Sequence, residues 1–65
     1  MRLDARLTRV ELAKRGMKQV DIVRKGIPLG TLNNAMQENR ISSATAEKIA
    51  SLIGTSVSKI EKKER

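Results

Sequence analysis

The sequence predicts an all-α fold, a compact bundle of five helices that forms one domain over residues 1–65. Aliphatic residues recur at spacings of three, four and seven, which is the pattern of a helix with one buried face. Four glycines and one proline separate most of these stretches from one another. A chain of 65 residues is long enough for one domain of this kind.

Glycine and proline mark most of the expected helix boundaries. Gly16, Gly26 and Gly54 each follow an apolar stretch, where glycine commonly ends a helix. Pro28 suits the first turn of the third helix, because its missing N–H needs no partner there. The helices are therefore expected at about residues 3–15, 19–25, 28–38, 44–53 and 57–63.

Each expected helix has an apolar face, and serine can cap the last two. Ser42 or Ser43 can cap the fourth helix, and Ser56 can cap the fifth. The fourth helix fits the helical spacing best. The apolar faces consist, in chain order, of Leu3, Leu7, Val10 and Met17; of Val20, Ile22 and Val23; of Leu32, Ala35 and Met36; of Ala46, Ile49, Ala50 and Ile53; and of Val57 and Ile60.

The composition excludes several classes of function. Cys and His are absent, which removes disulfides, Cys/His zinc sites, thiol nucleophiles and histidine acid–base pairs. No pair of carboxylates suited to catalysis can be assembled either, so we expect neither an enzyme nor a metal or other cofactor. Phe, Trp and Tyr are absent too, so bases of single-stranded nucleic acid would find no aromatic ring to stack on.

The charge of the chain favours a polyanionic partner. Lys and Arg number 14 against seven Asp and Glu, which leaves a formal charge of +7. Since the chain has no aromatic residues, the positive charge favours double-stranded over single-stranded nucleic acid. The alternative is a cationic surface that has no specific partner. The basic residues near the ends of the chain form two groups, either of which could be an ordinary solvated face: Arg6, Arg9, Lys14 and Arg15, and then Lys59, Lys62, Lys63 and Arg65.

A helix-turn-helix pattern is formed by two short expected helices and the tight turn at residues 26–28. Three runs of sequence, residues 15–23, 26–32 and 49–56, resemble in order and spacing the XRE family of phage Cro and C-type repressors. The resemblance covers residues 7–60. It implies the lambda repressor-like fold and a domain that binds double-stranded DNA.

The third helix is expected to contact the bases. Opposite its apolar face lie Gly30, Asn34 and Gln37, with Thr31 and Asn33 beside them. Asn and Gln can bond to N6 and N7 of adenine, and methyl groups of Thr or Leu can touch the thymine methyl. No Lys or Arg lies between residues 26 and 39, so an A·T-leaning half-site is expected. The base-contacting set is Leu29, Gly30, Thr31, Asn33, Asn34 and Gln37.

Two alternatives remain open for this helix. The polar side chains could be merely its solvated face. Gly30 either allows a close approach to DNA or is simply a weak helix position.

The phosphate contacts implied by the resemblance come from the start of the second helix and from the loop after the third. These residues are Lys18, Gln19, Asn39, Arg40, Ser42 and Ser43. For Lys18 and Arg40 the alternative is ordinary solubility. A serine there can cap the fourth helix and still bind phosphate.

A homodimer is also implied, because a single helix-turn-helix contacts few base pairs and such proteins pair on a palindromic operator. In the family the pairing surface follows the fourth helix, which here gives Thr55, Val57, Lys59 and Ile60. Lys59 stands where an apolar residue is common, so the dimer is expected to be weak and completed on DNA. The alternative is that Val57 and Ile60 only complete the core of the monomer.

The function expected from these observations is that of a stand-alone repressor of a phage or mobile element. It would be cytoplasmic, bacterial or phage-encoded, and no small-molecule ligand is expected. No membrane contact is expected either, since no apolar run approaches the ~20 residues of a membrane span or the apolar region of a secretory signal. Two alternatives are the DNA-binding antitoxin of a toxin–antitoxin pair and a helical adaptor that binds protein.

Overall fold

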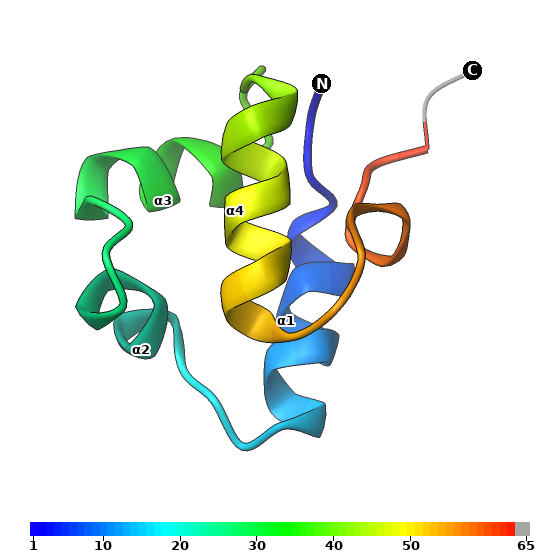
Figure 1. The fold of residues 1–65 in the computed structure, drawn as a ribbon. Helices are drawn as coiled ribbons and strands as arrows, with labels where there is room; N and C mark the ends of the chain where they lie inside the picture. Colours follow the sequence, from blue (N-terminus) through cyan, green and yellow to red (C-terminus); the bar gives the residue numbers. More distant parts are fainter. Residues whose placement is uncertain (64–65) are drawn as a thin grey trace.

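The computed structural model describes residues 1–63, which form four α-helices and one turn of 3-10 helix. These elements are α1 (Ala5–Lys14), α2 (Gln19–Arg24), α3 (Leu29–Met36), α4 (Ser43–Ile53) and the 3-10 turn η1 (Val57–Lys59). Figure 1 shows α4 running through the middle of the molecule, with α2 and α3 on one side and α1 and η1 on the other. The predicted compact helical fold is confirmed, with four α-helices over residues 1–63 in place of five.

The core is one aliphatic cluster to which every α-helix and both ends of the described chain contribute. Among its fully buried side chains, Leu3 comes from the segment before α1 and Ile60 from the residue after η1. The predicted inner faces of the third and fourth helices are confirmed. Their residues Leu32, Ala35, Ala46, Ile49, Ala50 and Ile53 are all at most 2% exposed.

Local capping signals fix most helix ends. The Ser42 hydroxyl accepts a hydrogen bond from the backbone N–H of Thr45 at 3.2 Å, so Ser42 rather than its neighbour caps α4. Gly54 ends α4 at a φ of 94°, a conformation that residues with a Cβ rarely adopt. Pro28 is the N-cap of α3 instead of its first helical residue. Ser56 precedes η1, but its side chain forms no capping bond.

The inner face of α1 differs from the predicted stripe that began at Leu3. Asp4 caps the helix by accepting a hydrogen bond from the backbone N–H of Leu7 at 3.0 Å, so α1 begins at Ala5. Val10 is 41% exposed, and the buried residues of this helix are Ala5, Thr8, Glu11 and Leu12. The predicted stripe was wrong because it was counted from Leu3. This residue lies outside the helix and therefore does not indicate which side of α1 is buried.

The C-terminal segment also differs from the predicted fifth helix over residues 57–63. After the single turn of η1 the backbone joins the N-terminal segment: the N–H of Asp4 donates to the carbonyl of Ile60 at 2.8 Å. Leu3 and Glu61 form an isolated antiparallel bridge. A longer helix would remove these bonds, and the charged residues after Ile60 offer it no further apolar face. Arg65, assigned to the second basic group, lies outside the described residues.

The helices are short, and the longest, α4, has 11 residues. Within residues 1–63, none is both long enough and apolar enough to cross a membrane. This observation does not test the cytoplasmic location, which stays a prediction.

The buried position of Ile60 can be tested by truncation. Ile60→Ala is expected to lower the free energy of unfolding by about 2–4 kcal/mol, because the shortened side chain leaves a cavity in the core. Lys59→Ala removes an exposed side chain one residue earlier and is expected to change the free energy of unfolding by less than about 0.5 kcal/mol. Urea unfolding followed by circular dichroism measures both. An Ile60→Ala variant as stable as the parent would show that this segment does not belong to the core.

Candidate nucleic-acid interface

The connection between α2 and α3 is short and anchored in the core. Gly26 turns the chain at a φ of 120°, in the left-handed region. Ile27, which follows, is 2% exposed, and its backbone N–H donates to the carbonyl of Ile22 at 3.3 Å. Pro28 then starts α3 in an extended conformation at ψ 142°. Because the apolar residue of the turn is buried, the orientation of α3 relative to α2 is fixed by the core.

The outer face of α3 is exposed and uncharged. Leu29 is 60% exposed at the first helical position, although it is apolar. No Asp, Glu, Lys or Arg occurs within α3. Figure 1 shows the helix at the edge of the molecule, beyond α4. Of the predicted base-contacting set, Thr31 is half-buried, and the exposed members are Leu29, Gly30, Asn33, Asn34 and Gln37.

Three amide side chains form a cluster at the end of this face. The Asn39 amide donates to Oδ1 of Asn34 at 3.2 Å and to Oε1 of Gln37 at 3.5 Å. The backbone N–H of Asn39 also donates to the carbonyl of Asn34 at 3.1 Å. Asn39, predicted as a phosphate contact, therefore turns its side chain towards two of the predicted base contacts.

The other predicted phosphate contacts lie at the ends of α2 and α3. Lys18, Arg40 and Ser43 are exposed, whereas Gln19 is half-buried. The exposed hydroxyl of Ser42 is already the cap of α4. These residues therefore lie at the start of α2, in the loop after α3 and at the start of α4.

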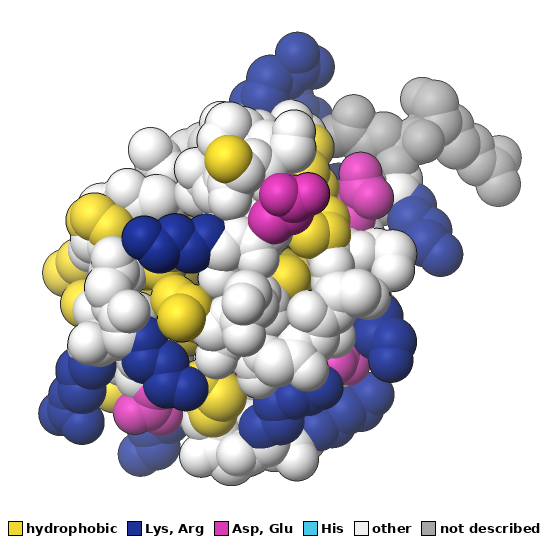
Figure 2. All heavy atoms as spheres, viewed as in Figure 1, with side chains coloured by type: hydrophobic (Ala, Val, Ile, Leu, Met, Phe, Trp, Pro, Cys, Tyr) yellow, Lys and Arg dark blue, Asp and Glu magenta, His cyan; other side chains and the backbone are white. Residues whose placement is uncertain are grey.

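The basic side chains lie over neighbouring elements and not within the outer face of α3. In Figure 2, Lys and Arg side chains gather over α2 and over the far end of α1, whereas the surface over α3 is mostly apolar or uncharged. Asp21 is an acidic residue of α2. Its carboxylate accepts a hydrogen bond from the backbone N–H of Lys18 at 2.7 Å. This bond satisfies an otherwise unpaired donor at the start of α2.

Glu38 ends α3 and was not singled out from the sequence. It adopts a φ of 62°, which is unusual for a residue with a side chain. Its carboxylate accepts hydrogen bonds from the ammonium of Lys62 and, at 3.0 Å, from the backbone N–H of Ala5. These two bonds, the one from Lys62 first, lower the pKa of Glu38. Its partners lie 24 and 33 residues away, so no local pattern indicates the contact.

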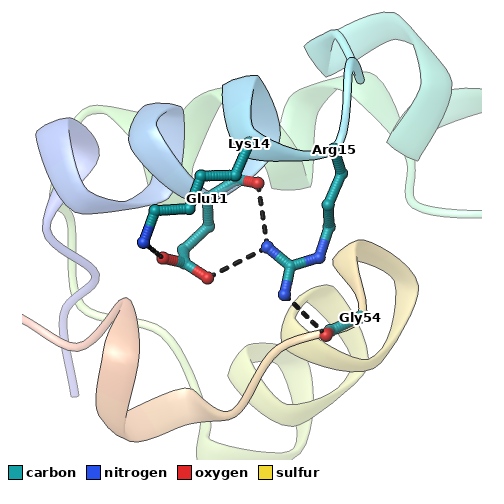
Figure 3. A network of polar contacts seen from close by, with 4 residues as sticks. All are labelled: Glu11, Lys14, Arg15 and Gly54. Atoms are coloured by element: carbon teal, nitrogen blue, oxygen red, sulfur yellow. Dashed lines mark hydrogen bonds and ion pairs between the residues drawn. The ribbon is translucent and has the colours of Figure 1, made fainter.

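Glu11 is a second structural carboxylate that the sequence did not reveal. It is 6% exposed, and its oxygens pair with Lys14 at 3.1 Å and with Arg15 at 3.0 Å (Figure 3). The hydrogen bond from Lys14, then the nearby hydroxyl of Thr55 and the hydrogen bond from Arg15, lower its pKa from 4.5 to about 2. The Thr55 hydroxyl is buried and forms no hydrogen bond of normal geometry within residues 1–63.

Arg15 connects this carboxylate to the end of α4. Its guanidinium donates to the backbone carbonyl of Gly54 at 2.9 Å, as well as to the side chain and the carbonyl of Glu11 (Figure 3). The sequence places Arg15 and Lys14 in a basic group around the first helix. The structure gives both residues an internal partner, and Arg15 in particular holds two helices together.

The predicted dimer contacts are mostly turned inward. Ile60 is fully buried in the core of the single chain, as its alternative role requires, and exposes no surface to a second copy. The pairing surface stays a prediction. Val57 is half-buried against the same core, and Thr55 has a buried hydroxyl. Among these residues only Lys59 is largely exposed.

Among residues 1–63, no group of three or more acidic, His or Cys side chains is placed to hold a metal ion. No pocket is found in the described part of the chain.

No family model, no curated protein and no solved structure matches this chain. The resemblance to the XRE family therefore stays a prediction.

The hydrogen bonds to Glu11 predict a characteristic dependence of stability on pH. Because its pKa in the folded protein is about 2 and the ordinary pKa of a Glu side chain is 4.5, the carboxylate contributes stability above pH 4.5 and loses it as the pH falls towards 2. Glu11→Gln is therefore expected to lower the melting temperature at neutral pH, by an amount that shrinks towards zero between pH 4.5 and 2.

Thermal melts at half-unit pH intervals measure this difference. Glu47→Gln, on the exposed side of α4, removes the same charge and is the matched control, with little expected change in melting temperature. If Glu11→Gln lowers the melting temperature by the same amount at pH 2 as at pH 7, the lowered pKa assigned to Glu11 is contradicted.

Proposed function

We propose that this protein binds double-stranded DNA sequence-specifically and regulates transcription, with α2, the turn at residues 26–28 and α3 acting as a helix-turn-helix. The observation that carries the proposal is the outer face of α3. It is exposed, free of charged side chains and rich in amides, and the opposite face of the same helix is buried in the core.

The dimensions of α3 suit the major groove. This groove is about 12 Å wide in B-form DNA and admits one α-helix. α3 lies at the edge of the molecule and is covered on one side only (Figure 1). A helix held in this way can enter a groove while its inner face stays packed against α1 and α2.

The chemistry of the exposed face favours A·T base pairs. Each of Asn33, Asn34 and Gln37 can pair with N6 and N7 of adenine through one amide. Leu29, at the start of the helix, can cover a thymine methyl group. An arginine, the usual partner of guanine, is absent from α3.

The surroundings of this face favour the phosphate backbone. Lys18 at the start of α2 and Arg40 after α3 are both exposed, and in the sequence they precede and follow the segment that would contact bases. Glu38, between them in sequence, is paired with Lys62 and so contributes little unbalanced negative charge. The formal charge of +7 adds a general attraction to the duplex.

Two copies on adjacent half-sites of a palindromic operator complete the proposal. With Ile60 buried, the surface available for pairing after α4 is small, which favours assembly on DNA over a stable dimer in solution. A repressor of a phage or mobile element is the role that these properties suit best.

Binding to duplex DNA is expected to weaken steeply with salt. The affinity should fall on a log–log plot with a slope of about −0.9 for each phosphate that is neutralised. Fluorescence anisotropy of a labelled duplex at several KCl concentrations measures the slope. A chain that binds no duplex at low salt would contradict the proposal and favour the protein-binding alternative.

Asn34 and Lys18 should separate contacts to bases from contacts to phosphates. Asn34→Ala is expected to cost about 1–3 kcal/mol on the specific site and little on scrambled DNA, because only base contacts carry sequence information. Lys18→Ala should weaken both duplexes alike and make the salt slope shallower by about one unit. Selection from a random duplex pool with the parent protein supplies the specific site.

The control for the lysine variant is Lys63→Ala, which removes the same charge from an exposed position in the segment after η1. It should alter specific and non-specific binding less than Lys18→Ala does. An Asn34→Ala variant that lowers both affinities equally, or neither, would show that α3 does not contact bases through this residue.

A further inference from the structure

Gly30 differs from the other glycines of the chain. Gly16, Gly26 and Gly54 all have positive φ values, between 64° and 120°, so their backbone conformations favour glycine. Gly30 lies inside α3 and is not among the residues with positive φ. Its backbone conformation is one that any residue can adopt.

Packing within the protein does not require a glycine at this position either. Apart from its two chain neighbours and the backbone of its own helical turn, a Cβ built on Gly30 would meet no atom of the chain within 4 Å. Glycine is at the same time a poor helix former, because it loses more conformational freedom on folding than alanine does. Within residues 1–63, therefore, neither backbone conformation nor packing requires the missing side chain, and a contact outside the chain would give it a role.

The neighbours of Gly30 indicate what lies opposite it in the bound state. It precedes Asn33 by three residues and Asn34 by four, so all three share one face of α3. Leu29, beside it, exposes 60% of an apolar side chain. A phosphate would be a poor neighbour for that leucine, whereas an apolar base edge would suit it. Without a Cβ, the helix backbone here is open between an apolar side chain and two amides.

We propose that Gly30 is a specificity-determining residue: the space that its Cβ would fill is occupied on binding by the C5-methyl edge of a thymine, which Leu29 covers from the side. This inference rests on the proposed function and deepens it. Thymine is then the base that approaches α3 most closely. The glycine favours binding, although alanine at this position would stabilise the helix more.

The first test adds one carbon at this position. Gly30→Ala is expected to raise the melting temperature by a few degrees, because alanine favours the helix and meets no atom of the chain. Its affinity for the selected duplex is expected to fall about tenfold, with less than a twofold change on scrambled DNA. Ala13→Val adds bulk at an exposed position of α1 and should leave both affinities unchanged.

The second test removes the methyl group from the DNA. Each thymine of the selected duplex is replaced in turn by deoxyuridine, which lacks only that methyl. One replacement is expected to weaken the parent protein several-fold and to have little effect on Gly30→Ala, because the variant no longer lets the methyl approach.

The outcomes separate this inference from the proposed function. A parent protein that selects no sequence contradicts the proposed function itself. If the parent selects a site and Gly30→Ala binds it equally well, only the role of Gly30 is overturned. An equal loss on selected and scrambled duplexes also overturns it, because the close approach would then be to a phosphate.

Discussion

The small size of a wholly aliphatic core is the constraint on which the rest of this structure depends. A chain of 65 residues without Phe, Trp or Tyr has few large side chains to bury, so both ends of the described chain have to contribute. Leu3 and Ile60 do so, and the bridge between Leu3 and Glu61 joins the two segments that carry them. Ile27 adds a buried side chain from the turn before α3. The orientation of the exposed helix is thus a consequence of how the core is filled.

Two carboxylates connect elements of the fold through hydrogen bonds. Aliphatic packing alone defines the relative positions of these elements less precisely. Glu11 and Arg15 connect α1 to the end of α4 at Gly54. Glu38 connects the end of α3 to the start of α1 and to Lys62. Directional hydrogen bonds of this kind specify one arrangement, whereas apolar contacts tolerate several.

The two faces of α3 have opposite requirements. Its inner residues, Leu32 and Ala35, are buried and therefore limited in size and polarity. Its exposed outer residues are not limited by core packing, and the amides of Asn34 and Gln37 pair with Asn39 at the surface. A face of amides with one exposed leucine and one glycine is poorly explained by stability alone. That contrast is the physical basis of the proposed contact with DNA and of the role assigned to Gly30.

The sequence by itself determined the features encoded within one or two helical turns: the inner faces of α3 and α4, the serine cap of α4, and the glycine that ends it. It also placed the exposed members of the candidate site on one face of α3. Only the tertiary structure decided the face of α1, the short turn in place of a fifth helix, and the internal roles of Ile60, Arg15 and Glu38. The reason is physical: Arg15 meets Gly54 across 39 residues and Glu38 meets Ala5 across 33, and contacts at such separations follow from packing, which no local pattern records.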